Sequence, residues 1–194
     1  MKQQDDTAII VIHEIYGINA HIGKVCEELS QHGFNVFSPD LLERKAFDYT
    51  EESEAYGHFK KYIGFEKGAE AVLQWAKKLK EQYGQVLLLG FSVGATIAWM
   101  CSETGIIDGV IGYYGSRIRD YIHLQPVCPT MLFFPENEDS FHVQELAAVL
   151  EKKQDVATHL FPGEHGFSDP YSRRYHEESA EKAFQLATSF LKSR

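Results

Sequence analysis

A serine between two glycines is the first candidate for chemistry in this sequence. The stretch Gly90-Phe91-Ser92-Val93-Gly94 has the pattern G-x-S-x-G. An apolar run, QVLLLGF (85–91), precedes the serine, and another apolar stretch follows from Val93, which leaves almost no room for a loop. A turn this tight displays a serine hydroxyl at the amino end of a helix, and glycines beside it avoid collisions with neighbouring backbone. The pattern therefore predicts that Ser92 is a nucleophile.

A serine hydroxyl becomes reactive only when a base takes its proton, and histidine is the usual base. His165, in FPGEHGF, follows the last expected strand and precedes the last expected helix, so it should reach the same sheet edge as Ser92. His13 also ends an expected strand, but it neighbours a different feature, Glu14, described below. We expect four other histidines to be exposed helix or loop residues: His21, His32, His58 and His176. Three more do not end a strand that points at the serine: His123, His142 and His159.

A carboxylate should orient the histidine and stabilise its protonated form. In the chain order serine, acid, histidine, it belongs in the loop PENEDSF that follows the run PTMLFF (129–134). That loop holds Glu136, Glu138 and Asp139, and at least two of the three must be solvated loop acids. From the residues alone, Glu138 and Asp139 remain equal candidates.

Alternating strands and helices would hold these residues in place. Continuous apolar or β-branched runs predict strands covered on both faces, at 8–12, 34–40, 85–91, 108–115, 129–134 and 156–161. Apolar residues at helical spacing predict helices between them, including 143–153 and 178–191. Strands that alternate with helices indicate an α/β fold, with a mostly parallel sheet and helices on both faces. No linker or repeat divides the chain, so we expect a single domain over residues 1–194.

Two segments, 41–64 and 116–128, lack clear periodicity. Both follow strands, so they should lie over the carboxyl edge of the sheet, where open α/β sheets bind ligands. They carry several aromatic residues, most of which should pack the segments down rather than contact a ligand.

The composition disfavours several classes of function. With 19 Lys and Arg against 28 Asp and Glu, the net charge of −9 disfavours a nucleic-acid or anionic-membrane partner. The start, MKQQDDTA, does not look like a signal peptide, and no apolar run approaches the roughly 20 residues of a membrane span. Cys26, Cys101 and Cys128 are widely spaced, which suggests reduced thiols in a cytoplasmic protein without a zinc or redox site.

Five segments together resemble the dienelactone hydrolase family of α/β-hydrolases over nearly the whole chain: HEIYGIN (13–19), SPDLL (38–42), GFSVGA (90–95), IGYYG (111–115) and GEHGF (163–167). The resemblance implies a small α/β-hydrolase fold. The family nucleophile, usually cysteine, corresponds to Ser92, and the family histidine corresponds to His165. An ungapped match from Pro129 puts the acid on Glu138, whereas matching the following phenylalanine puts it on Asp139.

The same resemblance implies an oxyanion hole made by the backbone amides of Ile15 and Val93, which are the donors that acyl transfer needs. It also places Glu14 beside the site as the strand-end glutamate of the family. The pair His13-Glu14 is not part of a zinc motif, because H-E-x-x-H would need a histidine where the chain has Gly17.

Two departures from the family concern the substrate. The family holds a substrate carboxylate with arginines, one of them four residues after the histidine, where this chain has Asp169. The other arginine region reads TEESEAYG here. We therefore expect a neutral acyl group in a pocket rimmed by Tyr16, Phe47, Tyr113 and Phe167. The expected substrate-binding residues are Glu14, Tyr16, Tyr113 and Phe167.

The sequence thus predicts a serine hydrolase that cleaves a small-molecule carboxylic ester or lactone through an acyl-enzyme, without a metal or organic cofactor. We expect a monomer or a small homo-oligomer. One alternative is a thioesterase or amidase with the same triad. The other is a catalytically inactive hydrolase fold that serves as a binding protein. The presence of Ser92, His165 and the loop acids argues against this second alternative.

Overall fold

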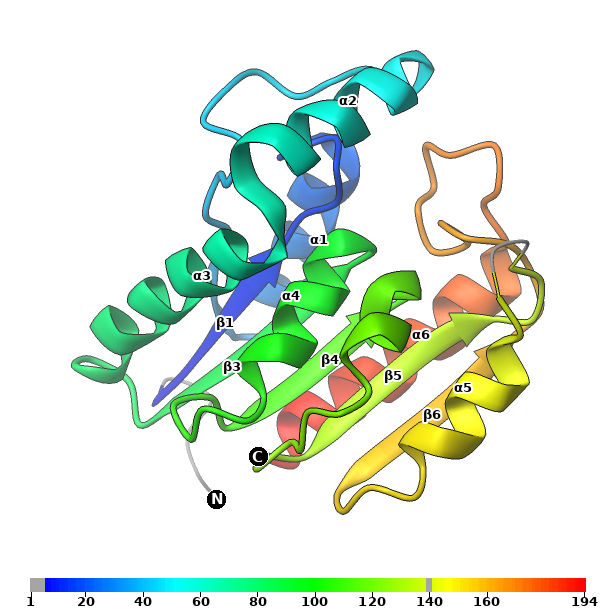
Figure 1. The fold of residues 1–194 in the computed structure, drawn as a ribbon. Coiled ribbons are helices and arrows are strands. Elements are labelled where there is room, and N and C mark those ends of the chain that lie inside the picture. The colour runs from blue at the N-terminus through cyan, green and yellow to red at the C-terminus, as the bar shows by residue number, and fades with distance from the viewer. Residues whose placement is uncertain (1–5, 139–140) are drawn as a thin grey trace.

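Six parallel strands form one sheet in the computed structural model, which describes residues 6–138 and 141–194. The strand order is β2-β1-β3-β4-β5-β6, and each of the five pairings is parallel. The strands are β1 (Thr7–Ile12), β2 (Asn35–Phe37), β3 (Gln85–Phe91), β4 (Gly109–Tyr113), β5 (Thr130–Pro135) and β6 (Val156–Phe161). Parallel neighbours need crossover connections, and helices supply most of them (Figure 1).

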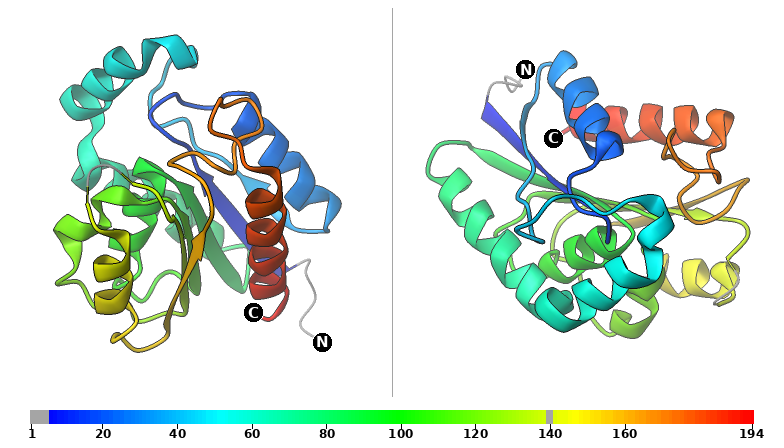
Figure 2. Two further views of the ribbon diagram at one scale, coloured as in Figure 1. Left: turned by 90° about the vertical axis from the view of Figure 1, so that its right-hand side faces the viewer. Right: turned by 90° about the horizontal axis from the view of Figure 1, so that it is seen from above.

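Helices cover both faces of the sheet (Figure 2). One face carries α1 (Ala20–Gln31) and α6 (Glu177–Lys192), and the other carries α3 (Gly64–Lys80), α4 (Val93–Cys101) and α5 (Val143–Leu150). Among the described residues, no helix is both long enough and apolar enough to cross a membrane.

The core follows from the alternation of side chains along each strand. In β1, Ile9 and Val11 pack in the cluster with α1 and α6, whereas Ile10 and Ile12 pack in the cluster with α3 and α4. All four are fully buried, because each face of the strand meets a helical layer. This two-sided burial explains the continuous apolar runs in the sequence and confirms the predicted α/β fold.

The segment 41–64 lies over the carboxyl ends of the strands, as expected (Figure 1). The segment 116–128 only begins there and then runs back to the amino end of β5, where the amide of Val127 donates to the carbonyl oxygen of Ser102. The first contains a 3-10 turn, η2 (Tyr49–Glu51), then α2 (Glu52–His58) and a π-helical turn, η3 (Phe59–Ile63), none of which was predicted. The second contains the 3-10 helix η4 (Ser116–Tyr121). The predicted strand at 34–40 is also shorter in the structure, where β2 covers three residues.

Candidate active site

The turn between β3 and α4 is as tight as the sequence suggested. Ser92 has a backbone φ of 52° and ψ of −113°, a strained conformation for a residue with a side chain. A Cβ atom at Gly94 would lie 2.3 Å from the carbonyl oxygen of Ile12, and one at Gly90 would lie 2.2 Å from that of Gly94. Both obstacles are backbone atoms that cannot move aside, so glycine is required on each side of the serine.

Ser92, His165 and Glu138 form a continuous chain of hydrogen-bonding atoms. The Oγ atom of Ser92 lies 2.9 Å from Nε2 of His165, and Oε2 of Glu138 lies 3.0 Å from Nδ1 of the same ring. With Glu138 ionised, Nδ1 carries the proton and donates a hydrogen bond to the carboxylate, which leaves Nε2 free to accept one from the serine hydroxyl. The side chains of His165 and Glu138 are 28% and 12% exposed.

Of the two acids that the sequence left open, the structure places Glu138 against the histidine. Asp139 lies outside the described residues. Glu136 is exposed in the same loop, and no hydrogen bond between its side chain and His165 is present among the described residues.

His13 ties the end of β1 to the segment that follows β2. Its Nδ1 atom donates to the carbonyl oxygen of Glu14 (2.6 Å), and its Nε2 atom accepts from the backbone amide of Leu41 (3.0 Å). Burial lowers the pKa of His13, and the neutral ring has the one donor and one acceptor that this geometry uses. Next to it, Ile15 lines the same pocket as Ser92 and Val93. The amide of Val93 opens α4, where backbone donors have no partner inside the helix.

Glu14 is a buried carboxyl group at the bottom of this pocket. Its side chain is almost inaccessible, and its Oε1 atom has no hydrogen-bond partner within the described part of the chain. Burial, followed by the charge of Asp169, raises the pKa of Glu14 to about 7, while His165 and a hydrogen bond from Tyr114 oppose the rise. The group therefore holds its proton far more tightly than an ordinary glutamate.

Asp169 links the segment after β6 to the segment 41–64. Its Oδ2 atom accepts a hydrogen bond of 2.5 Å from the hydroxyl of Tyr49, which in turn receives one of 3.0 Å from Asn19. Its Oδ1 atom accepts from the backbone amide of Tyr171 (2.9 Å) and lies 3.9 Å from Nδ1 of His21. Both oxygens of this buried acid are thus engaged within the protein.

The pocket around Ser92 has a volume of about 780 Å³. Tyr16 lines it as expected, together with Tyr49 and Tyr56 from the segment that carries α2. The charged lining contains five acids and three arginines: Glu14, Glu52, Glu138, Glu164 and Asp169, with Arg117, Arg119 and Arg174. No periodic pattern assigns the arginines to the wall of this pocket, since two of them lie in the irregular segment 116–128.

Three of the four residues expected to rim the pocket lie elsewhere. Phe47 packs beneath the segment with Leu42 and Ala55, and Phe167 is fully buried in the core between the sheet and α6. Tyr113 pairs with Phe91 in the strand register, and both side chains point to the face covered by α1 and α6. Tyr113 therefore lines a different cavity.

His21 also differs from its prediction. It is 1% exposed rather than a surface residue, because it lies on the inner side of α1 and packs edge-on against Phe91. Within the described residues, no cluster of three or more His, Cys, Asp or Glu side chains is arranged to hold a metal ion.

The parallel sheet, its two helical layers and the glycine-flanked serine at the end of β3 define an α/β-hydrolase fold. The profile of the dienelactone hydrolase family matches residues 1–194, and the chain belongs to this family.

Comparisons with individual proteins agree with this membership. The uncharacterized protein YczH of Bacillus subtilis (strain 168) is 38% identical over 192 residues, covering 96% of this chain and 93% of the relative. Carboxymethylenebutenolidase 1 of Cupriavidus pinatubonensis is 26% identical, covering 86% of this chain and 78% of the relative. The crystal structure of a dienelactone hydrolase-like promiscuous phosphotriesterase from metagenomic libraries superposes with a TM-score of 0.77. The two chains are 16% identical, and the superposition covers 96% of this chain and 86% of the other. This similarity supports the fold alone.

Proposed function

We propose that this member of the dienelactone hydrolase family is a serine hydrolase that cleaves carboxylic esters or lactones through a covalent acyl-enzyme. The observation that carries the proposal is the hydrogen-bonded chain from Ser92 through both ring nitrogens of His165 to Glu138. A hydroxyl, a base and an orienting acid in this order are what nucleophilic catalysis by serine requires.

In the proposed first half-reaction, Nε2 of His165 takes the proton of Ser92 as the serine oxygen attacks the carbonyl carbon. The ionised Glu138 stabilises the imidazolium that forms. The carbonyl oxygen gains negative charge, and the backbone amides of Ile15 and Val93 are the donors proposed to hold it. The carbon–oxygen bond to the leaving group then breaks, and His165 gives its proton to the departing alkoxide.

In the second half-reaction, water takes the place of the alcohol. His165 removes a proton from the water as its oxygen attacks the acyl-serine, and the ester bond to Ser92 breaks. The same proton returns to the serine oxygen. The cycle consumes one ester or lactone bond and one water, and it leaves the enzyme unchanged.

The charges in the pocket favour a neutral acyl group. Asp169 is an acid buried beside the site, so a substrate carboxylate placed near it would lose its hydration and meet repulsion. Glu14 adds to this repulsion only when it loses its proton, at a pKa of about 7. The pocket arginines each have a protein partner: Arg117 lies 3.0 Å from Asp120, Arg174 lies 3.6 Å from Glu164, and Arg119 donates to the carbonyl oxygen of Ser116. These cations are engaged before any substrate arrives.

A panel of esters, lactones and thioesters with matched acyl groups tests the proposal. A butenolide belongs in the panel, because several relatives carry the name carboxymethylenebutenolidase. We expect ester or lactone turnover by the wild type and a loss on the order of 10⁴-fold or more in Ser92→Ala. Equal turnover by Ser92→Ala would refute the proposed mechanism. Thioester turnover well above that of the matched ester would favour the thioesterase alternative.

A further inference from the structure

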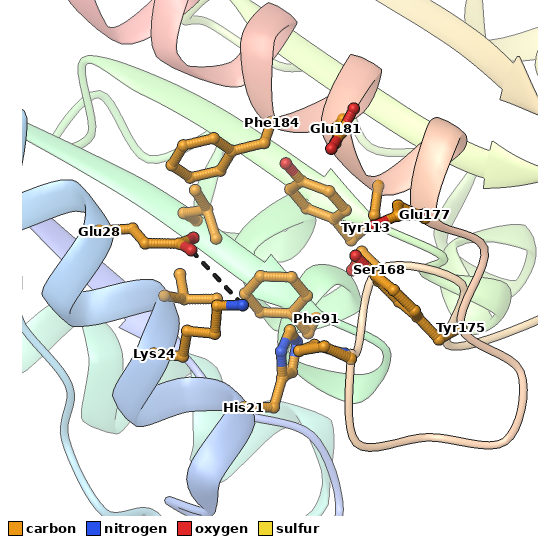
Figure 3. A pocket seen from close by; sticks show the side chains of 14 residues that line it. His21, Lys24, Glu28, Phe91, Tyr113, Ser168, Tyr175, Glu177, Glu181 and Phe184 are labelled. Carbon is orange, nitrogen blue, oxygen red and sulfur yellow. Dashed lines mark ion pairs between the residues drawn. The ribbon is translucent and has the colours of Figure 1, made fainter.

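A second cavity lies on the face of the sheet that α1 and α6 cover. We call it the α1–α6 cavity, because these two helices form its sides and the segment 168–177 closes one end (Figure 3). Its volume is about 300 Å³, at the lower end of the range of small-molecule sites. Neither Ser92 nor His165 lines it.

The floor of the α1–α6 cavity is aromatic. Phe91 and Tyr113 lie side by side with ring centroids 4.7 Å apart and an angle of 27° between their planes. Leu89 of β3 continues this apolar floor, and Val25 and Phe184 extend it up α1 and α6. Such a floor suits a flat or compact apolar group, and aromatic faces attract cations.

The mouth of the cavity is acidic. Glu28 from α1 and Glu177 and Glu181 from α6 line it, and among the cavity residues Lys24 is the cation that faces them, 3.8 Å from Glu28. Burial and then the charge of Glu177 raise the pKa of Tyr175, and the charges of Glu181 and Glu28 add to this rise against the effect of Lys24. The helix dipole accounts for Glu177 in the first turn of α6, but it does not account for Glu28 in the last half of α1.

His21 supplies an independent sign of a ligand. It lines the cavity and is 1% exposed, and neither ring nitrogen has a hydrogen-bond partner among the described residues. Its nearest charged neighbour is Asp169, at 3.9 Å from Nδ1. Burial lowers the pKa of His21 to about 4, so the ring is neutral and retains one acceptor. A buried polar group left without a partner is costly, and its presence at a cavity wall marks a place where a donor would be stabilised.

We propose that the α1–α6 cavity binds a small organic ammonium ion with an apolar or aromatic body. The body would lie on Phe91 and Tyr113, while the ammonium would donate to the carboxylates at the mouth and to the neutral imidazole of His21. This binding involves no step of the hydrolase reaction, so a test of the binding proposal is independent of a test of the proposed function.

Titration of the nitrogen-15-labelled full-length protein with 2-phenylethylamine, followed by NMR, tests the proposal. Its neutral analogue 2-phenylethanol and the anion phenylacetate are the matched probes. We expect saturable shifts of the amides of Tyr175, Ala180 and Glu181 with the amine, weaker binding of the alcohol and none of the anion. The amine should bind more weakly at high salt, because the contacts at the mouth are partly exposed.

Charge removal at the mouth gives the sharper comparison. The double variant Glu177→Gln, Glu181→Gln should weaken binding of the amine by roughly threefold to tenfold and leave the alcohol unaffected. Glu178→Gln is the matched control, because Glu178 pairs with Lys182 on the same helix and does not line the cavity. It should leave amine binding unchanged. Ala180→Leu, which adds volume inside the cavity, should weaken both the amine and the alcohol.

Three results would overturn the inference. The first is an absence of saturable shifts around α6 with millimolar amine. The second is a set of shifts confined to the neighbourhood of Ser92 and His165. The third is equal loss of binding in the double variant and in Glu178→Gln, which would show that the amine responds only to the overall negative charge of the protein.

Discussion

The Oε2 atom of Glu138 lies 3.0 Å from Nδ1 of His165, across 27 residues of sequence. This contact fixes which ring nitrogen carries the proton, and it turns the opposite nitrogen toward Ser92. The acid stands in the loop after β5 and the histidine in the loop after β6, and these two strands are neighbours in the sheet. The pairing of the strands therefore brings the two side chains together.

Replacement of Glu138 by glutamine should lower kcat by a factor on the order of 10³–10⁴, because an amide no longer stabilises the imidazolium or selects its tautomer. The measurement is kcat for an activated aryl ester. Glu136→Gln, in the same loop and exposed, should retain nearly full activity. Asp139→Asn resolves the alternative that the sequence left open, and we expect it also to be close to wild type. If Asp139→Asn is the inactive variant, the assignment of Glu138 is wrong.

Replacement of Gly94 by alanine should destabilise the fold by about 3 kcal/mol or more, because its Cβ would lie 2.3 Å from the carbonyl oxygen of Ile12. Urea unfolding measures this free energy. Gly23→Ala is the control, since a Cβ at that position in α1 meets no atom within 4 Å. It should stabilise the protein by about 0.5–1 kcal/mol. Similar free energies for the two variants would contradict the described geometry of the turn.

Glu14 should make the stability of the protein fall as the pH rises from about 4.5 to about 7. Below this window the carboxyl is protonated in both folded and unfolded chains. Within it, the unfolded chain loses the proton, at a pKa near 4.5, while the folded chain keeps it up to about 7. The difference amounts to about 3 kcal/mol of lost stability above pH 7.

The Glu14→Gln variant stays neutral throughout and should lack this contribution. Its unfolding free energy relative to wild type should therefore rise between pH 4 and pH 8, as measured by urea unfolding at each pH. The exposed Glu103→Gln is the control and should track wild type. A difference between Glu14→Gln and wild type that does not change with pH would show that folding does not raise the pKa of Glu14.

Neutral short-chain aryl esters should have a higher kcat/KM than matched esters that carry a free carboxylate. The buried Asp169 disfavours an anion, and the arginines of the pocket already have partners. The pair should be measured at low and at high salt. If the anionic ester is the better substrate and its advantage shrinks with salt, an arginine such as Arg117 attracts it.

Much of this fold could be predicted from local sequence. The strands at 8–12 and 85–91 were recognisable because burial on both faces leaves only apolar residues, and the tight turn at Ser92 was recognisable from its glycines. The helix α2 and the turn η3 were missed because their stability depends on contacts distant in sequence, including those of Ala55 and Phe59.

The predicted rim of the pocket failed for a related reason. Whether the last residue of a strand points toward one helical layer or the other depends on the register of the sheet, which local patterns do not show. Tyr113 ends β4 on the face of α1 and α6, away from Ser92. His21 is buried because α1 happens to pack its first turn over Phe91, a contact between residues seventy positions apart.

The central claim is that Ser92 forms the covalent intermediate, and intact-protein mass spectrometry after treatment with a fluorophosphonate tests it most directly. We predict one adduct on the wild-type protein, none on Ser92→Ala, and slower labelling of His165→Gln. An adduct that persists on Ser92→Ala, or an unlabelled wild type that still hydrolyses esters, would contradict the assignment of Ser92 as nucleophile.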